Sequence, residues 1–498
     1  MSPRPTFSDA ARAARSVKRE IGSAAGHALG SAIDRAVTAH HARRLQRIGW
    51  RPALEVNGLD WARKGIPARS GNKVEVLIDG ASFLPMLAEE LARAESHVHI
   101  TGCFFSPELE LTRGDDPVIV RNLLAELAER IDVRVLIWSG APLPIFTPSR
   151  GDVRRMVEQF SRRNKIRCEF DTCVRFMHCH HEKTIVIDDR VAFVGGIDLT
   201  LDGGDPYDNQ DHASRGVVGW HDVSMRIEGP AVTDVAEHFR LRWHGAAKEE
   251  LPASRISDAV GDVDLQIVRT IPENVYETSL PLGDFTVLES YVGAFRSAER
   301  LIYIENQFLW SSEIVALLAE KLRDPPHDDF RIVVLLPINA NDGADISRGQ
   351  VAALIHADDG NARFLACSVY ARTGNLRDPI YVHAKVAIVD DRWLTIGSAN
   401  LNEHSLFNDS EVNVVSHDAN LARDTRLRLW SEHLELPIEE IDGDPTTVVN
   451  EHWEPIAEEQ LDRLQRDLPL THRLVKLPGV SIRHRRFLGS LQGRIYDA

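Results

Sequence analysis

Two stretches of the chain, far apart in sequence, combine apolar runs and short polar turns in the same way. The runs at 184–187 (TIVI) and 386–389 (VAIV) are each followed by a turn of two aspartates and an arginine. A second apolar run then ends in glycine, so each stretch predicts a β-hairpin. Strands without polar alternation are buried on both faces, which predicts helices on both sides of a sheet. Helical patterns at 83–94 and 313–323 are candidates for those helices.

The hairpins belong to a longer internal repeat. Residues 181–198 and 383–400 align without a gap at an offset of 202 residues (383 − 181), and 94–105 follows the same plan as 298–309. A repeat of this length is a domain-sized duplication. We therefore predict an α/β fold of two homologous lobes, each a mixed β-sheet flanked by helices, paired about a pseudo-two-fold axis. The expected divisions are an N-terminal region at 1–68, lobes at 69–250 and 251–440, and a C-terminal extension at 441–498.

The N-terminal region differs from the lobes in its charge. Residues 1–52 carry ten basic and three acidic residues, a net +7, whereas the rest of the chain carries 48 basic and 71 acidic residues, a net −23. An acidic body repels a long polyanion, so no nucleic-acid partner is expected. Residues 8–48 have the pattern of a basic amphipathic helix. Two interpretations stay open: adsorption to an anionic membrane surface, or packing against the lobes.

Hydropathy and cysteine content favour a protein of the cytoplasm, with a peripheral place at the membrane as the alternative. No stretch approaches the roughly 18 apolar residues of a membrane-spanning helix. The five cysteines are sparse and odd in number, which argues against a disulfide framework. Cys168, Cys173 and Cys179 lie near three histidines, so a zinc cluster has to be considered. Their Cys-x4-Cys-x5-Cys spacing is not that of a zinc finger, and no metal or other cofactor is expected.

One motif occurs in both halves of the repeat. It is His-x-Lys-x4-Asp, formed once by His181, Lys183 and Asp188 and again by His383, Lys385 and Asp390. Chance would produce about 0.03 such matches in a chain of this composition, so two matches in register indicate function. Residues i and i+2 of a strand share a face, so each histidine projects with its lysine. Two paired lobes would bring all four side chains to a single site.

This set of side chains suits cleavage of a phosphodiester. A neutral imidazole can attack phosphorus to form a phosphohistidine while a second, protonated imidazole gives its proton to the leaving alkoxide. The two lysines would neutralise the non-bridging oxygens, so the chemistry needs no divalent metal. Each motif ends in an aspartate that follows a strand at a turn, where an acid more readily orients backbone than touches substrate.

The motifs and their surroundings resemble the phospholipase D superfamily. In that family the motif continues to Gly-Ser-x-Asn, which GSAN at 397–400 matches, while GGID at 195–198 stands in the first half, as in many phospholipases D. The resemblance covers about residues 70–430. Further matches to its phosphatidyl-transferring members are ITGCFFSPE (100–108), GWHD (219–222), GPAVTDVAEHFRLRW (229–243) and YIENQF (303–308).

The resemblance implies a role for each residue of the composite site. His181 would be the nucleophile and His383 the general acid, with the reverse order left open. A carboxylate after each motif would orient that motif's own histidine through its other ring nitrogen, Asp222 in the first half and Glu411 in the second. The phosphate would be held by Lys183, Lys385 and Asn400, with Asp198 in the corresponding place of the first lobe.

The implied activity is cleavage of the head-group phosphodiester of a glycerophospholipid, with transfer of the phosphatidyl group to water or an alcohol. A cardiolipin-synthase-like transferase is the alternative, and a nuclease of the same superfamily fits less well because the body is acidic. A membrane adaptor with a dead site would have lost a motif histidine or lysine, and none is lost. Head-group and acceptor preference cannot be carried over, because His404 stands for the family's arginine in NEHS (402–405) and DPYD (205–208) replaces Gly-Arg-Trp-Asp.

Overall fold

The first half of the chain forms a seven-stranded mixed sheet in this computed structural model, which describes residues 35–142, 148–175, 178–201, 203, 219–338, 344–373 and 376–477. The strands β2, β3 and β4 are parallel, and every other pair of neighbours is antiparallel. In spatial order the strands are β4 (Arg167–Asp171), β3 (Asp132–Trp138), β2 (His97–Gly102), β5 (Thr184–Ile187), β6 (Val191–Gly195), β8 (Val223–Glu228) and β1 (Arg69–Ile78).

The second half repeats this sheet strand for strand. The parallel strands are again the three at one edge of the sheet, here β11, β12 and β13. At the opposite edge β9 pairs with β1 of the first half, so the two sheets are joined edge to edge. Two additional strands, β14 (Leu376–Pro379) and β19 (Leu474–Lys476), pair with β13, and β10 (Asp284–Phe285) pairs with β9. In spatial order the seven shared strands are β13 (Phe364–Thr373), β12 (Arg331–Leu335), β11 (Leu301–Asn306), β16 (Lys385–Val389), β17 (Trp393–Gly397), β18 (Glu411–Ser416) and β9 (Val263–Ile271).

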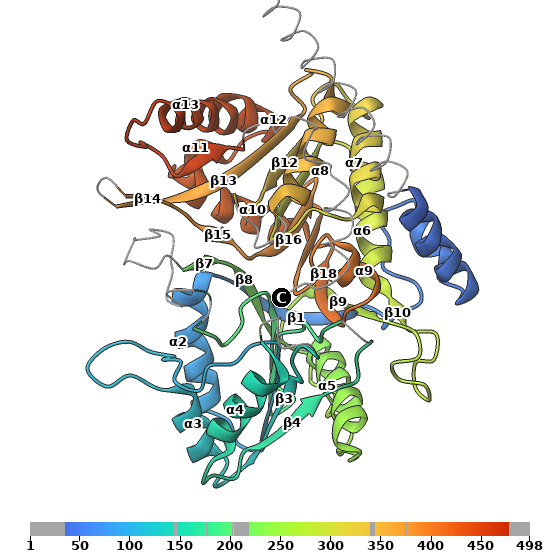
Figure 1. Cartoon of the computed structure of the whole chain (residues 1–498), viewed down its shortest axis with the longest axis vertical. Coiled ribbons are helices and arrows are strands. Elements are labelled where there is room, and N and C mark those ends of the chain that lie inside the picture. Colours follow the sequence, from blue (N-terminus) through green and yellow to red (C-terminus); the bar gives the residue numbers. More distant parts are fainter. Residues whose placement is uncertain are drawn as a thin grey trace, which may run out of the picture.

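Helices cover both faces of each sheet, as the unbroken apolar strands predict. Figure 1 shows the first half in its lower part and the second half in its upper part, each with its own helices. In the first half, α2 (Asp79–Ala92), α3 (Val120–Leu127) and α4 (Arg150–Ser161) pack on one face and α5 (Ala231–Ala247) on the other. In the second half, α6 (Thr286–Ser297), α7 (Ser312–Arg323) and α8 (Ala344–Asp358) lie opposite α10 (Ala419–Leu434), α11 (Ile438–Ile441), α12 (Pro445–Val448) and α13 (Glu454–Gln465).

The two halves share one hydrophobic core. Val194 and Met225 of the first sheet belong to the same buried cluster as Leu394 and Val414 of the second. The predicted α/β architecture is therefore confirmed, and so are the helices expected at 83–94 and 313–323, which are α2 and α7. The exact borders of the expected divisions stay predictions. Residues 248–262, which connect α5 to β9, contain neither helix nor strand.

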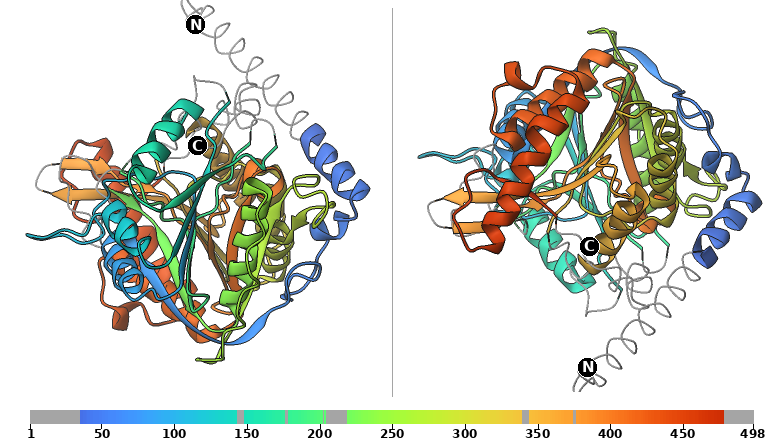
Figure 2. Two further views of the ribbon diagram at one scale, coloured as in Figure 1. Left: turned by 90° about the horizontal axis from the view of Figure 1, so that it is seen from below. Right: turned by 90° about the horizontal axis from the view of Figure 1, so that it is seen from above.

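The described part of the N-terminal region packs against the second half. A helix at 35–47 lies beside α6 and α7 in all three views (Figures 1 and 2). His41 donates a 2.8 Å hydrogen bond from Nδ1 to the Glu313 carboxylate and stacks on Phe407, while Arg44 forms an ion pair of 2.6 Å with Glu273. For these residues packing on the lobes is the observed arrangement. The rest of the expected helix, the DPYD segment and residues 478–498 lie outside the described residues.

None of the described helices is long and apolar enough to cross a bilayer.

Candidate active site

The segment that leads into each motif pairs with the other half of the molecule. His180 forms a parallel bridge with Ser410, and the backbone N–H of His181 donates to the Ser410 carbonyl over 3.0 Å. In the second copy, β15 (Tyr381–Val382) lies parallel to β7 (Trp220–His221), and the N–H of His383 donates to the His221 carbonyl over 2.8 Å. Each motif histidine therefore sits at the junction of the two sheets.

This exchange of segments decides which carboxylate orients which histidine. Nδ1 of His181 lies 3.0 Å from Oε1 of Glu411, and Nδ1 of His383 lies 2.6 Å from Oδ2 of Asp222. The pairing predicted within each half is wrong, because the carboxylates reach across to the opposite motif. Asp222 and Glu411 are nevertheless the two acids that contact the histidines. The reciprocal contacts are those expected for two copies related by an approximate two-fold axis.

Backbone carbonyls fix the tautomer of both histidines. The Ser398 carbonyl lies 3.1 Å from Nδ1 of His181, and the carbonyl of Gly196, at the matching position of the other copy, bonds to His383. A carbonyl can only accept, so Nδ1 carries the proton and, in the neutral ring, Nε2 keeps a lone pair. Position 196 has to be glycine because the Asp222 carboxylate lies close to its backbone: a Cβ there would stand 2.1 Å from Oδ1 of Asp222.

Burial governs the electrostatics of the orienting acids. It raises the pKa of Asp222, while the charge of Lys385 works in the opposite direction. It also raises the pKa of Glu411 well above its usual range, against the charge of Lys183 and two hydroxyl donors. Those donors are the Oγ atoms of Ser398 and Ser405, each 2.5 Å from the carboxylate. The acids are held in place by hydrogen bonds on several sides.

The two lysines have different surroundings. Each Nζ donates to the carbonyl of its own motif histidine. Burial acts to lower the pKa of Lys183, but the neighbouring acids, first Asp198 at 3.2 Å, outweigh it and raise the pKa. Burial lowers the pKa of Lys385 to about 8, with Asp222 opposing the shift and Lys183 adding to it. Burial and the two lysines also hold the pKa of His383 well below its ordinary value.

Asn400 and Asp198 occupy equivalent places beside the lysines. Nδ2 of Asn400 donates to Oε1 of Gln307 over 3.2 Å, and Nε2 of Gln307 donates to the Tyr381 hydroxyl over 2.9 Å. Oδ1 of Asn400 and Oδ1 of Asp198 are buried without a hydrogen-bond partner. Trp220 stacks on His383 with ring centroids 4.1 Å apart. Sequence reasoning assigned no role to Gln307 and Trp220, although both lie in segments that carried the family resemblance.

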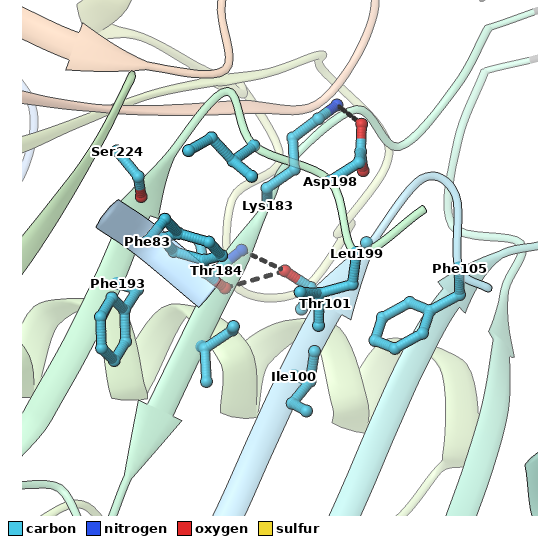
Figure 3. Close-up of a pocket in the computed structure, with 13 residues that line it drawn as sticks. Phe83, Ile100, Thr101, Phe105, Lys183, Thr184, Phe193, Asp198, Leu199 and Ser224 are labelled. Atoms are coloured by element: carbon cyan, nitrogen blue, oxygen red, sulfur yellow. Dashed lines mark hydrogen bonds and ion pairs between the residues drawn. The ribbon is translucent and has the colours of Figure 1, made fainter. Parts of the chain in front are cut away.

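Hollows lie on the first-half side of the site. One of about 280 Å³ is bordered by Lys183 and Asp198 together with apolar side chains, and Figure 3 shows the Lys183–Asp198 pair at its rim. A second, of about 400 Å³, is bordered by Trp220, Asp222 and again Asp198. Apolar members of the first lining include Phe83, Ile100, Phe105, Phe193 and Leu199.

The aspartates that end the two motifs are structural. Both have φ values in the left-handed region, 57° for Asp188 and 52° for Asp390, as the hairpin turn requires. The carboxylate of Asp188 accepts the backbone N–H groups of residues 95, 96 and 97, and that of Asp390 accepts those of residues 299, 300 and 301. They sit at the far ends of β5 and β16 from the histidines. Membership in the motifs makes both aspartates candidates for catalysis, but their observed contacts are the backbone contacts that the turn predicts.

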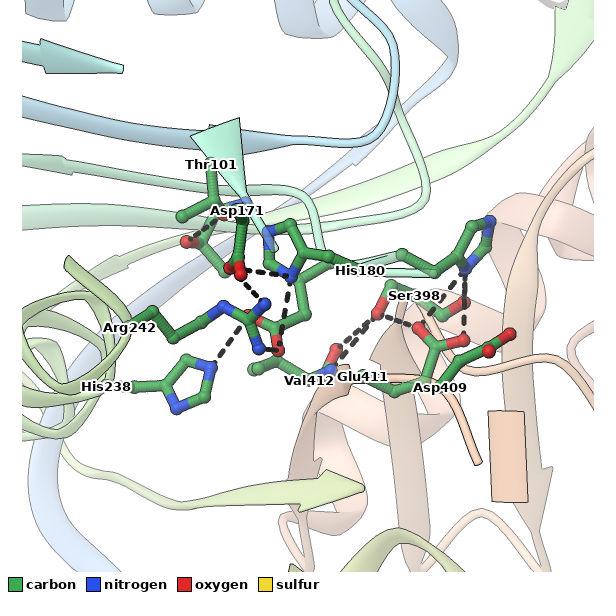
Figure 4. A network of polar contacts seen from close by, with 12 residues as sticks. Thr101, Asp171, His180, His238, Arg242, Ser398, Asp409, Glu411 and Val412 are labelled. Carbon is green, nitrogen blue, oxygen red and sulfur yellow. Dashed lines mark hydrogen bonds and ion pairs between the residues drawn. The ribbon is translucent and has the colours of Figure 1, made fainter. Parts of the chain in front are cut away.

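Successive residues of an extended segment point to opposite faces. The neighbours of His181 in the first motif therefore point away from the site, into a buried network of charged side chains. Arg242 of α5 donates to Oε1 of Glu182 over 3.0 Å and also pairs with Asp171, and His238 lies 2.7 Å from Oε2 of Glu182 (Figure 4). Burial acts to raise the pKa of Glu182, but Arg242 and His238 hold it far below its usual range. In the second copy the equivalent positions are the core residues Val382 and Ala384.

A second buried network supports Asp222 and joins the halves. Nδ1 of His221 lies 2.9 Å from Asp79 in α2, and its Nε2 lies 2.8 Å from Glu305 in β11. Asp79 also accepts the N–H of Asp222 over 3.1 Å. Burial acts to lower the pKa of His221, but Asp79 and Glu305 outweigh it and raise the pKa well above the ordinary value. The GWHD and YIENQF segments were the sequence signal for this network.

Comparison with known proteins shows what this chain is similar to. The family described as "Cardiolipin synthase, PLD-like domain" matches residues 291–431. Phospholipase D A of Dictyostelium discoideum is 26% identical over 74% of this chain and 36% of its own length, and phospholipase D alpha 4 of Arabidopsis thaliana is 24% identical over 77% and 70%. Among solved structures, phosphatidylserine synthase of Haemophilus influenzae matches 79% of this chain and 93% of its own with a TM-score of 0.49 and 14% identity.

This chain spans about a third of the length of the Dictyostelium relative. The segment that matches the family model, residues 291–431, contains the second motif. The paired motifs and the comparisons agree: over about three quarters of its length this chain is similar to proteins named phospholipase D, and residues 291–431 match a PLD-like domain.

Proposed function

We propose that this protein is a phospholipase D-type phosphodiesterase that transfers a phosphatidyl group through a phosphohistidine intermediate. The observation that carries the proposal is the crossed pair of histidines, each with Nδ1 bonded to the other half's carboxylate at 3.0 and 2.6 Å. That arrangement leaves two Nε2 atoms and two lysines for one phosphate. The relatives named phospholipase D support the same reaction class.

In the first step Nε2 of His181 attacks phosphorus and the bond from phosphorus to the head-group oxygen breaks. His383 gives its Nε2 proton to that oxygen, so the head group leaves as a neutral alcohol. Glu411 and the Ser398 carbonyl stabilise the positive charge that develops on His181 through its Nδ1–H. The product is a phosphatidyl group bonded to His181, with His383 neutral.

His383 has to gain its proton before this step. Burial and the two lysines lower its pKa in the free site. A phosphodiester bound between Lys183 and Lys385 brings a negative charge that offsets both lysines, and this raises the pKa of His383. Substrate binding thus supplies the proton donor that the leaving group needs.

In the second step water or an alcohol attacks phosphorus on the side from which the head group left. Neutral His383 takes the proton of the incoming hydroxyl, and the bond from His181 to phosphorus breaks. Water gives phosphatidate, and an alcohol gives a new phosphatidyl ester. Lys183, Lys385 and Asn400 hold the phosphate in both steps, and Asp198 holds Lys183.

Glycerophospholipid is the substrate class that the site suits best. The relatives named phospholipase D support this substrate class. The net charge of −16 disfavours a polymeric nucleic acid. Transfer to a lipid alcohol, as in a cardiolipin-synthase-like enzyme, is the second candidate, because the matching family model is described by that name. Reaction at a membrane surface follows from the same substrate.

Head-group release measured on mixed vesicles tests this proposal. The intact protein is incubated with choline, ethanolamine, serine and glycerol phospholipids, with and without added alcohol, beside a single-stranded oligonucleotide. We expect lipid products, a phosphatidyl alcohol when alcohol is present, and no cleavage of the oligonucleotide. His181→Ala, prepared in parallel, controls for contaminating activity. Undetectable lipid turnover with or without alcohol would contradict the substrate assignment.

A further inference from the structure

A cluster of three metal-ligating side chains lies beside His181 and takes no part in the proposed reaction. It is formed by His178, His404 and Asp409, whose ligand atoms all lie within 4.8 Å of one another. Nδ1 of His178 lies 3.3 Å from Nδ1 of His404 and 3.2 Å from Oδ1 of Asp409. The cluster joins a segment of the first half to α9 (Glu403–Phe407) and the residues after it.

The two spacings from Nδ1 of His178 are those of a tetrahedral zinc site, and the third lies within 4.8 Å. Two donors each about 2.0–2.1 Å from a tetrahedral ion stand about 3.3 Å apart, which is the separation observed here. Two histidines and one carboxylate are a ligand set that zinc accepts with a fourth position open. The side chain of His178 is 16% exposed, so water has access to that position.

Hydrogen bonding alone accounts poorly for this arrangement. Nδ1 of His178 can hold one proton, and it faces both a carboxylate oxygen and a second imidazole nitrogen at bonding distance. If the proton points at Asp409, Nδ1 of His178 has no lone pair left to accept a hydrogen bond from His404. If it does not, Asp409 keeps only the backbone N–H and the thiol of Cys179 as donors. A divalent cation satisfies the three atoms together.

The surroundings of Asp409 fit a metal ligand. The backbone N–H of Cys179 donates to Oδ1 over 3.0 Å, and its Sγ lies 3.4 Å from Oδ2, which orients the carboxylate from behind. The resemblance to the family predicts an arginine at position 404, and a bound cation would restore the positive charge that His404 does not carry permanently.

We propose that His178, His404 and Asp409 bind one divalent transition-metal ion of the zinc class, with water as the fourth ligand and Cys179 supporting Asp409. The cysteine cluster considered from the sequence contributes no direct ligand to this set. Cys168 and Cys173 lie elsewhere, and none of the clusters found among the described side chains includes a cysteine.

Such an ion would position the nucleophile rather than react. His178 lies three residues before His181, and Asp409 lies two residues before Glu411. Ser405, next to His404, donates to Oε1 of Glu411 over 2.5 Å. The ion would thus fix the position of the segments that carry His181 and Glu411, and these segments belong to different halves of the molecule.

Metal binding can be measured without any assay of lipid turnover. The full-length protein is stripped with a chelator and titrated with Co²⁺, whose visible absorption is strong only in a tetrahedral site, and then with Zn²⁺ in competition. We expect one saturable Co²⁺ per chain, displaced by Zn²⁺, without a thiolate charge-transfer band. Zn²⁺ should also raise the midpoint of thermal unfolding.

Substitutions locate the site. His178→Ala and Asp409→Asn should each weaken Zn²⁺ binding at least about 100-fold, and His404→Arg should abolish it, because even partners behind the ligands contribute 10–100-fold. His356→Ala is the matched control, since His356 is an exposed histidine of α8 outside the cluster. Circular dichroism is used to check that each variant is folded. The absence of a tetrahedral Co²⁺ spectrum in the unaltered protein, or unchanged affinity in folded His404→Arg, would overturn the proposal.

Discussion

The two copies of the motif hold their histidines in the same way but treat their lysines differently. Lys183 is paired with Asp198 at 3.2 Å, and its pKa is raised despite burial. Lys385 has Asn400 at the equivalent place, and burial lowers its pKa to about 8. One substitution at one position of the repeat, aspartate at 198 and asparagine at 400, separates the two environments.

The difference matches the site to the charge of its substrate. Lys183 already has a carboxylate partner in Asp198, whereas the equivalent place in the second copy is a neutral amide, so Lys385 gains more from the −1 charge of a phosphodiester. A second aspartate would weaken that attraction, and a second asparagine would remove the carboxylate that does most to raise the pKa of Lys183. The duplication thus kept the geometry that catalysis needs and changed the charge at one copy. Four predictions test this comparison of the two copies of the motif.

The largest expected effect separates the roles of the two histidines. His181→Ala should lower kcat on the order of 10⁴-fold or more with every substrate, because it removes the attacking nitrogen. His383→Ala should be comparably slow with a lipid but recover much of its rate with a p-nitrophenyl phosphodiester, whose leaving group needs no proton. Steady-state kinetics with the two substrates measure this. Equal losses with both substrates for His383→Ala would contradict its role as the acid.

The next effect concerns the lysines. Lys385→Gln should lower kcat/KM about 10²–10³-fold, since it removes the cation whose neighbour in the repeat is the neutral Asn400 instead of an aspartate. Lys183→Gln leaves Asp198 as a buried, uncompensated charge and should cost about 3–5 kcal/mol of unfolding free energy. Denaturant unfolding of Lys183→Gln and of the double variant Lys183→Gln/Asp198→Asn checks this, because the second change should restore most of the stability. No recovery in the double variant would show that the pair is not coupled.

A third prediction uses pH. Lys385 must be charged to bind an anion, and its pKa of about 8 means that the charge is lost as the pH rises through that value. We expect kcat/KM to fall above about pH 8. Asn400→Asp places a carboxylate beside Lys385, which raises the pKa and moves the fall to higher pH. The pH profile of kcat/KM for both proteins is the measurement, and superimposable profiles would contradict the assignment.

The smallest effect on chemistry is expected at the ends of the motifs. Asp188→Ala and Asp390→Ala each remove the acceptor for three backbone N–H groups and should cost about 1–3 kcal/mol of unfolding free energy. Both should leave kcat within a few-fold of the unaltered protein at a temperature where they are folded. A loss of kcat like that of the histidine variants would return these residues to the catalytic group.

Much of the fold follows from local patterns. The apolar runs gave both hairpins, and the repeat predicted two sheets of the same plan. The convergence of the four motif side chains near one junction also follows from the repeat. The crossed pairs His181–Glu411 and His383–Asp222 do not, because they depend on backbone bridges between segments more than 150 residues apart, with separations of 230 and 161 residues for the pairs themselves.

The cluster of His178, His404 and Asp409 could not be predicted from the sequence for the same reason. Its members are 226 and 5 residues apart in sequence order, and only the bridge between His180 and Ser410 brings them together. The cysteine spacing pointed to the segment that contains His178, but no cysteine belongs to the cluster found among the described side chains. Long-range contacts of this kind carry no local sequence signature.

The most direct test of the account is to trap the covalent intermediate. The protein is mixed with a phospholipid labelled in its phosphatidyl group, quenched in acid after a short time, digested and analysed by mass spectrometry. The account predicts a phosphatidyl adduct on His181, no adduct in His181→Ala, and an adduct in His383→Ala with the activated phosphodiester. An adduct on His383 in the unaltered protein would contradict it and reverse the two roles.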